Sequence, residues 1–158
     1  ELAQGVKGKG KIIFAGNGAS ASIASHGAVD FTKQAGIRGI TFNEANLITC
    51  LSNDFGYEKI FERSIQSLGN SKDILIAITT SGNSKNIINA IKKAKLLGIQ
   101  VFGFLGSGGG KALKYCDQSF VVPSYSTARI QESHITAGHA LMECIEENLF
   151  KSDYLKKY

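Results

Sequence analysis

The sequence lacks the features of a membrane-spanning or exported protein. No apolar run approaches the ~18 to 20 residues that a transmembrane helix requires, and no signal-peptide pattern opens the chain. Only 3 of the 158 residues are cysteines, widely spaced and without a C-x-x-C pair, which argues against a disulfide framework or a structural zinc site and for a reducing compartment. We therefore expect a cytoplasmic protein with no membrane association, whose cysteines are small buried residues.

The sequence also lacks the signs of a second domain or of a nucleic-acid partner. It contains no Pro/Ser-rich linker and no low-complexity stretch, so its 158 residues fit one compact domain. The net charge is +5, and lysines gather within 92–95 and 151–157, without the interleaved aromatic residues of single-strand binders. We expect no nucleic-acid partner. A basic balance also suits phosphorylated substrates, although net charge alone does not identify the ligand.

Short apolar runs and helical patterns alternate along the chain. The apolar runs are continuous, as expected for strands buried on both faces of a parallel sheet. The expected strands are Lys11–Ala15, Gly39–Phe42, Asp73–Thr79, Gln100–Leu105 and Gln118–Val122. The expected helices are Ser20–Gln34, Ile48–Gln66, Ser84–Leu97, a shorter one near Lys111–Cys116 and a last one from about Arg129 to Phe150. This alternation predicts an α/β fold with right-handed crossovers, a doubly wound three-layer sandwich around a central five-stranded parallel sheet.

Glycine and hydroxyl-bearing residues follow three of the expected strands, at 16–20, 80–84 and 106–110. Ligands of open α/β sheets bind outside the carboxyl ends of the strands, so we expect these loops to border the site. Thr79–Ser84 (TTSGNS) predicts a phosphate site, because its hydroxyls can donate and the following helix offers free N–H groups and its dipole. No lysine completes a nucleoside-triphosphate P-loop. The alternative is ordinary helix capping by Ser81 or Ser84.

The segment Gly16–Ala21 also fits G-x-G-x-x-A, a variant of the dinucleotide-binding fingerprint. That fingerprint expects an acidic residue about 20 positions further on, and Glu44 lies later than this. Dinucleotide binding is therefore a minor alternative. Glycines of a tight strand–helix turn are compatible with either interpretation.

Two pairs of residues on the expected helices are candidates for a metal site or for proton transfer. His26 and Asp30 stand four apart among small or apolar residues, so they project from one helix face. They could supply a metal site or an acid–base pair, or form only an intrahelical salt bridge, and both interpretations stay open. Gln131 and His139 are eight apart, ~80° around the last expected helix, so both can reach one cleft. His134 lies ~140° from His139, and we expect it to pack or to contact a neighbouring subunit.

Together these motifs resemble the sugar isomerase (SIS) family, and within it the phosphoheptose isomerases. The resemblance is carried, in order, by AGNGAS at 15–20, a His with a carboxylate four residues later at 26–30, LSNDFGYEKIF at 51–61, TTSGNSKN at 79–86 and RIQESHITAGH at 129–139. It implies an aldose–ketose isomerase that makes D-glycero-D-manno-heptose 7-phosphate from sedoheptulose 7-phosphate through an enediol, in heptose biosynthesis. It also implies a homotetramer with sites between subunits, and an N-terminal helical segment that is largely absent from this sequence, which begins at Glu1.

The resemblance implies roles for individual residues. Asp30 and His139 would share the proton transfers, and a zinc ion would polarise the substrate carbonyl. The residues implied to hold zinc are His26, Asp30, Gln131 and His139. The residues implied to contact the substrate are Asn17, Gly18, Ala19, Ser20, Asn53, Asp54, Thr79, Thr80, Ser81, Ser84 and Gln131. Family members usually have Glu at the position of Asp30, so a second hypothesis is a non-catalytic SIS protein that binds a sugar phosphate or a protein partner.

Overall fold

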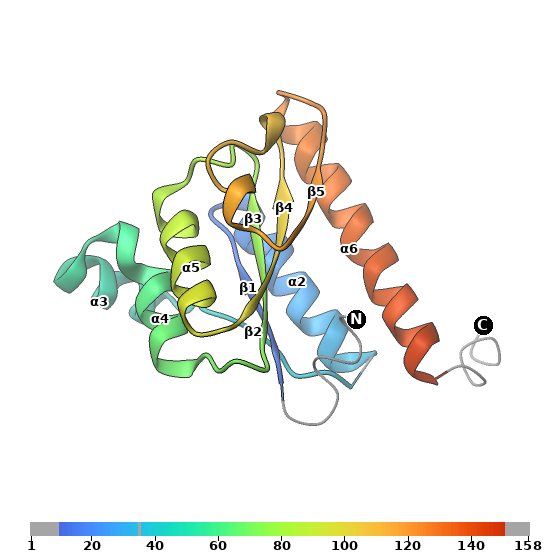
Figure 1. Cartoon of the computed structure of the whole chain (residues 1–158), viewed down its shortest axis with the longest axis horizontal. Coiled ribbons are helices and arrows are strands. Elements are labelled where there is room, and N and C mark those ends of the chain that lie inside the picture. Colours follow the sequence, from blue (N-terminus) through green and yellow to red (C-terminus); the bar gives the residue numbers. More distant parts are fainter. Residues whose placement is uncertain (1–9, 35, 151–158) are drawn as a thin grey trace.

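The computed structural model describes residues 10–34 and 36–150 (Figure 1). The expected N-terminal segment and the lysines at 151–157 lie outside the described residues. No helix within the described ranges is both long and apolar enough to cross a membrane.

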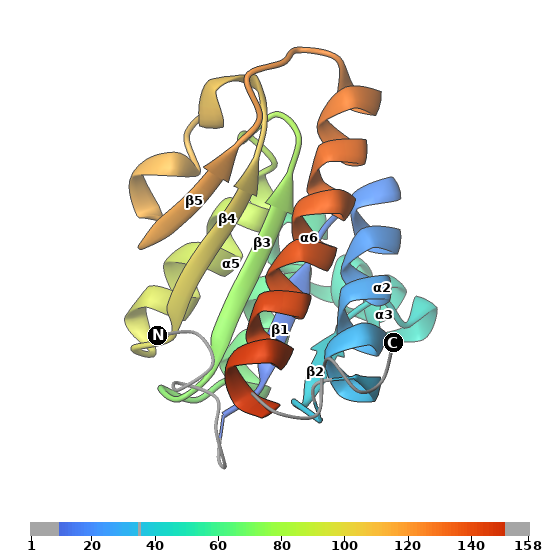
Figure 2. The same ribbon diagram turned by 90° about the vertical axis from the view of Figure 1, so that its right-hand side faces the viewer.

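A five-stranded parallel sheet forms the centre of the protein, as predicted (Figure 2). Its strands are β1 (Ile12–Ala15), β2 (Gly39–Thr41), β3 (Ile74–Thr79), β4 (Gln100–Leu105) and β5 (Gln118–Val121). They lie in the order β2-β1-β3-β4-β5, and every neighbouring pair is parallel. The chain passes to one side of β1 to form β2 and to the other side to form β3, so the switch point of the sheet lies between β1 and β3.

Helices cover both faces of this sheet, which confirms the three-layer architecture (Figures 1 and 2). One face carries α2 (Ala19–Lys33) and α6 (Thr127–Phe150), and the other carries α3 (Ala45–Phe55), α4 (Ile60–Leu68) and α5 (Lys85–Leu96). The side chains of β1 alternate between these faces, because successive residues of a strand point to opposite sides. Ile12 and Phe14 join the core under α2 and α6, whereas Ile13 and Ala15 join the core under α4 and α5.

The expectation that every strand is buried on both faces is wrong for β5, and it holds only in part for β2, whose residues are all partly buried. Gln118, Ser119 and Phe120 are exposed, while β1 and β3 are buried throughout. The reason is the position of β5 at an edge of the sheet, beyond β4. The expected burial of the cysteines is also wrong for Cys50 and Cys144, which are exposed.

Two helix predictions need correction. The pattern over 48–66 is not one helix, because Gly56 has a φ of 88° and ends α3 before a 3-10 turn, η1 (Tyr57–Lys59), leads into α4. Near 111–116 the chain forms only a 3-10 turn, η3 (Leu113–Tyr115), after a similar turn η2 (Ser107–Gly109). The backbone N–H of Ala112 donates to the carbonyl oxygen of Gly82 at 2.9 Å, so this segment is tied to a neighbouring loop.

Candidate active site

The loop after β3 is supported by the loop after β4. Gly82 has a φ of 64°, and a Cβ atom placed on it would lie 2.0 Å from the carbonyl oxygen of Gly109. The side-chain oxygen of Asn83 accepts a hydrogen bond from the backbone N–H of Lys111 at 3.1 Å. Two of the three predicted loops therefore lie in direct contact at the carboxyl edge of the sheet.

The N-cap residue of α5 provides no side-chain cap, contrary to the capping alternative. Ser84 occupies the N-cap position but makes no capping hydrogen bond, and its hydroxyl lies 3.2 Å from that of Thr79. Ser81 accepts a hydrogen bond from the backbone N–H of Asn83, which closes a turn and does not cap the helix. The N–H of Ile87 donates to the side chain of Asn86. The N–H groups of Lys85 and Asn86 and the positive end of the helix dipole thus remain to face the loop, as an anion site requires. Thr80 is partly buried and Ser81 is exposed in the same turn.

The loop after β1 lies against the start of α5. Asn17 exchanges hydrogen bonds with the side chain of Asn86 in the first turn of α5. Gly18, with a φ of 56°, is the N-cap residue of α2 and supplies no side-chain cap. Ala19 is exposed and Ser20 is buried. Two uncapped helix N-termini therefore meet near the switch point of the sheet.

Asn53 and Asp54 are exposed near the end of α3. The Asn53 amide donates to the Asp54 carboxylate at 2.8 Å, and neither residue bonds to the loops after β1 or β3. Tyr57, just beyond them, does reach the loop after β1, because its hydroxyl donates to Asn17 at 2.9 Å. The end of α3 therefore lies beside that loop.

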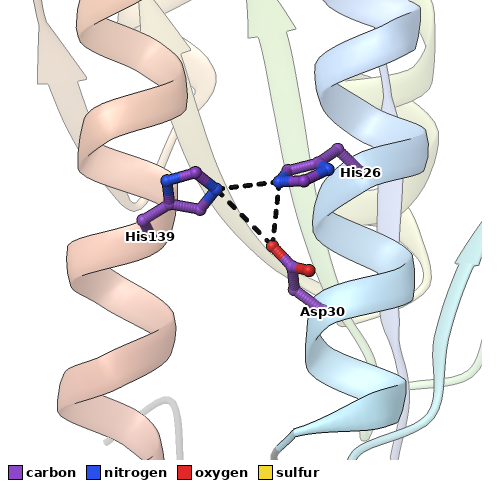
Figure 3. A group of neighbouring side chains, drawn as sticks. All are labelled: His26, Asp30 and His139. Carbon is purple, nitrogen blue, oxygen red and sulfur yellow. Dashed lines mark hydrogen bonds and ion pairs between the residues drawn. The ribbon is translucent and has the colours of Figure 1, made fainter.

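His26, Asp30 and His139 come together between α2 and α6 (Figure 3). The Nε2 atoms of the two histidines are 2.8 Å apart, and the Asp30 Oδ2 atom lies 3.1 Å from that of His26 and 3.6 Å from that of His139. The side chains of His26 and His139 are 49% and 45% exposed, so a ligand can reach them, whereas that of Asp30 is 14% exposed. The group borders an apolar pocket that includes Phe14 and Ile78.

The spacing of these three donor atoms is compatible with a bound metal ion. Tetrahedral zinc with ligands at about 2.0–2.1 Å separates its ligand atoms by roughly 3.3 Å, close to the distances within the group. Both interpretations of His26 and Asp30 have support, because their side chains lie within salt-bridge distance and His139 extends the pair to a group that could hold a metal. The side chain of Gln131 makes no hydrogen bond to any described residue, and Gln131 lies about 12 Å before His139 along α6. Its role as a ligand therefore stays a prediction.

His134 packs in the core, one of the two expected outcomes. Its side chain is fully buried between Phe104 and Phe120, and its Nε2 atom lies 3.0 Å from the carbonyl oxygen of Leu105. Burial lowers the pKa of the imidazole, and the hydrogen bond to Leu105 offsets this only in part. His134 therefore anchors α6 to the end of β4 and takes no part in the group around His139.

Two residues of this region were not singled out by the sequence. Tyr57 and Asn86 lie inside the motifs at 51–61 and 79–86, but nothing in their spacing distinguishes them from structural residues. Only the hydrogen bonds that both make with Asn17 identify them.

Comparisons with known proteins agree on one family. The model of the SIS domain matches residues 1–106. Phosphoheptose isomerase 1 of Campylobacter jejuni is 42% identical over 153 residues, which cover 93% of this chain and 82% of that protein. The phosphoheptose isomerase of Leptospira biflexa is 44% identical, over 96% of this chain and 82% of that protein.

Solved structures give the same result. The phosphoheptose isomerase of Neisseria gonorrhoeae superposes with a TM-score of 0.89 at 35% sequence identity, over 92% of this chain and 81% of that one. The phosphoheptose isomerase of Francisella tularensis superposes with a TM-score of 0.88 at 33% sequence identity, over 92% of this chain and 80% of that one.

Proposed function

Because the chain belongs to the SIS domain family and groups with its phosphoheptose isomerases, we propose that it converts sedoheptulose 7-phosphate to D-glycero-D-manno-heptose 7-phosphate. The observation that carries this proposal lies on α2. This helix starts at a loop bonded to the N-terminus of α5 and, about two turns later, holds His26 and Asp30 against His139. An anion site and a group of proton-transfer residues thus lie along one helix.

The phosphate of the substrate binds at the N-terminus of α5 in this proposal. The supporting features are the absence of a side-chain cap and the hydroxyl groups of the preceding turn. The proposed phosphate ligands are Thr79, Thr80, Ser81 and Ser84. Asn17, Gly18, Ala19, Ser20, Asn53, Asp54 and Gln131 are proposed to contact the sugar.

The reaction is a proton shift between two carbon atoms. A base takes a proton from C1 of the ketose while the carbonyl oxygen at C2 gains one, which gives a 1,2-enediol. A proton then returns to C2 while the C1 hydroxyl loses its proton, which leaves the aldehyde at C1. Asp30 and His139 are the proposed pair, because a carboxylate and an imidazole beside an apolar pocket can exchange protons with a bound sugar. Although Asp30 is one methylene shorter than Glu, its Oδ2 atom lies within 3.6 Å of both histidines.

The metal proposed for this group is zinc, one ion per subunit. His26, Asp30 and His139 would hold it, with Gln131 as the fourth ligand. Two imidazole nitrogens and a carboxylate oxygen form a donor set common in zinc enzymes. A bound zinc ion would act as a Lewis acid on the substrate carbonyl.

The proposed assembly is a homotetramer in the cytoplasm. Helix α3 has no buried residue, and Phe55 near its end and Tyr57 just beyond it are 45% and 52% exposed, which supports burial of this region against another subunit. Cys50, Cys116 and Cys144 are all free thiols, which suits a reducing compartment.

The direct test is incubation of the protein with sedoheptulose 7-phosphate, after chelation and again after addition of zinc. We expect the aldose product by NMR or by a coupled assay. Binding of the sugar phosphate without any turnover at high protein concentration would instead favour a non-catalytic SIS protein.

A further inference from the structure

One side-chain amide joins three segments of the candidate site. The Oδ1 atom of Asn17 accepts hydrogen bonds from the Asn86 amide at 2.8 Å and from the Tyr57 hydroxyl at 2.9 Å. The Asn17 amide nitrogen in turn donates to Oδ1 of Asn86 at 2.9 Å. Asn17 follows β1, Tyr57 lies in η1 and Asn86 lies in α5, so these bonds connect the loop after β1 to both of the other segments.

The orientation of the Asn17 amide is determined by its partners. Asn86 is 2% exposed, and its Oδ1 atom also accepts from the backbone N–H of Ile87 at 2.9 Å. That bond identifies the oxygen of Asn86, so its nitrogen must face the oxygen of Asn17. Because the Asn17 oxygen carries no hydrogen, the Tyr57 hydroxyl must be the donor in their bond.

This arrangement leaves Asn17 with a restricted capacity for a ligand. Its oxygen already accepts two hydrogen bonds, which uses both lone pairs, and its nitrogen has one N–H left. Asn17 can therefore donate one hydrogen bond to a sugar and accept none. A sugar hydroxyl that must donate would find no partner on this side chain.

Helix α5 also holds the turn that presents Tyr57. Asn89, three residues after Asn86 and so on the same side of the helix, donates from its amide to the carbonyl oxygen of Glu58 at 3.0 Å. Gly56, with its φ of 88°, ends α3 immediately before Tyr57. One helix thus fixes both partners of Asn17.

We propose that Tyr57 and Asn86 are positioning residues for the isomerase. They hold the Asn17 amide in the orientation that offers its one free N–H to an oxygen of the sugar phosphate bound at the start of α5. The identity of that ligand rests on the function proposed above. If the Asn17 amide is already held in place before the ligand binds, less side-chain conformational entropy is lost on binding.

The test is Tyr57→Phe, with Tyr125→Phe as the matched control. Removal of the Tyr57 hydroxyl leaves the Asn17–Asn86 pair in place, and the Tyr125 side chain is 88% exposed and bonded to no described residue. We expect Tyr57→Phe to raise KM for sedoheptulose 7-phosphate about threefold to tenfold, the effect of one hydrogen bond. Because the lost contact serves substrate and transition state alike, kcat should stay within about twofold of the parent. Tyr125→Phe should change neither value.

An unchanged KM in Tyr57→Phe overturns the inference, whatever happens to the unfolding temperature. If the parent protein binds the sugar phosphate without turnover, the proposed activity fails, and the dissociation constant takes the place of KM with the same expected rise. If it binds no sugar phosphate at all, the backbone amide signals of Gly16 and Gly18 in the ligand-free protein decide by NMR. Shifts in Tyr57→Phe but not in Tyr125→Phe support the positioning role, and unshifted signals refute it.

Discussion

The Nε2 atoms of His26 and His139 lie 2.8 Å apart, although the residues are 113 positions apart in the sequence and belong to different helices. At this distance only one hydrogen atom fits between them, so either one imidazole donates to the other or both face a common cation. Asp30 lies close to both. The three donor atoms lie within 4.8 Å of one another, and this grouping leads to the first two predictions.

Removal of either histidine should abolish tight zinc binding. We expect His26→Ala and His139→Ala each to weaken zinc affinity more than about 100-fold, because loss of an outer-sphere partner alone costs about 10- to 100-fold. The measurement is competition with a chromophoric chelator. Thr136→Ala, on an exposed part of α6, should retain the parent affinity. Parent-like affinity in both histidine variants would exclude this group as the metal site.

The length of the acidic side chain should tune activity without being essential. Asp30→Glu should keep or raise kcat/KM, because the carboxylate remains within reach of both histidines, whereas Asp30→Ala should abolish turnover. Steady-state kinetics with sedoheptulose 7-phosphate measure both effects. Full activity of Asp30→Ala would remove this carboxylate from the reaction.

The packing of Gly82 against Gly109 should make Gly82 intolerant of any side chain. Gly82→Ala combines a left-handed φ with a Cβ atom 2.0 Å from a carbonyl oxygen, and we expect a loss of about 2 to 4 kcal/mol of unfolding free energy. Gly108→Ala has a similar φ of 73° but no atom within 4 Å of the new Cβ, so it should cost only roughly 1 to 2 kcal/mol. Urea denaturation compares the two, and equal losses would show that the contact is unimportant.

Burial of His134 should make stability depend on pH. Its pKa is lowered in the folded protein, so the unfolded chain binds a proton more readily. The stability associated with the neutral imidazole is therefore fully present above the ordinary histidine pKa of about 6.5 and is lost as the pH falls below it. The slope should reach at most about 1.4 kcal/mol per pH unit.

The control for this prediction is His134→Gln, which retains a donor for the carbonyl oxygen of Leu105 but has no proton to gain. Its unfolding free energy should fall less steeply than that of the parent protein between pH 7 and pH 5. Parallel profiles would assign the acid sensitivity to other groups.

The sheet was predictable because the strands appear as apolar runs in the sequence, and those of β1, β3 and β4 reflect their burial in the interior. The exposure of β5 could not be predicted, because it depends on the order of the strands in the sheet. The end of α3 at Gly56 was hidden for a related reason, because apolar residues such as Phe55 and Ile60 continue the helical pattern across the break.

The site was predictable to a similar degree. His26 and Asp30 are four residues apart on one helix, so their proximity follows from local geometry. Their contact with His139, and that of Asn17 with Tyr57 and Asn86, depends on how distant segments pack. No periodicity within a short stretch of sequence contains that information.

The close approach of Gly82 to Gly109 also bears on how such a site can change. Gly82 lacks a side chain where the backbone of Gly109 passes, and Gly110 lacks one where the backbone of Ser81 and Gly82 passes. An insertion or a bulky residue in one loop would therefore displace the other. Changes of sequence in the loop after β3 and in the loop after β4 therefore have to be compatible with each other. A redesign for a longer or shorter sugar phosphate would have to exchange residues 80–84 and 106–111 together.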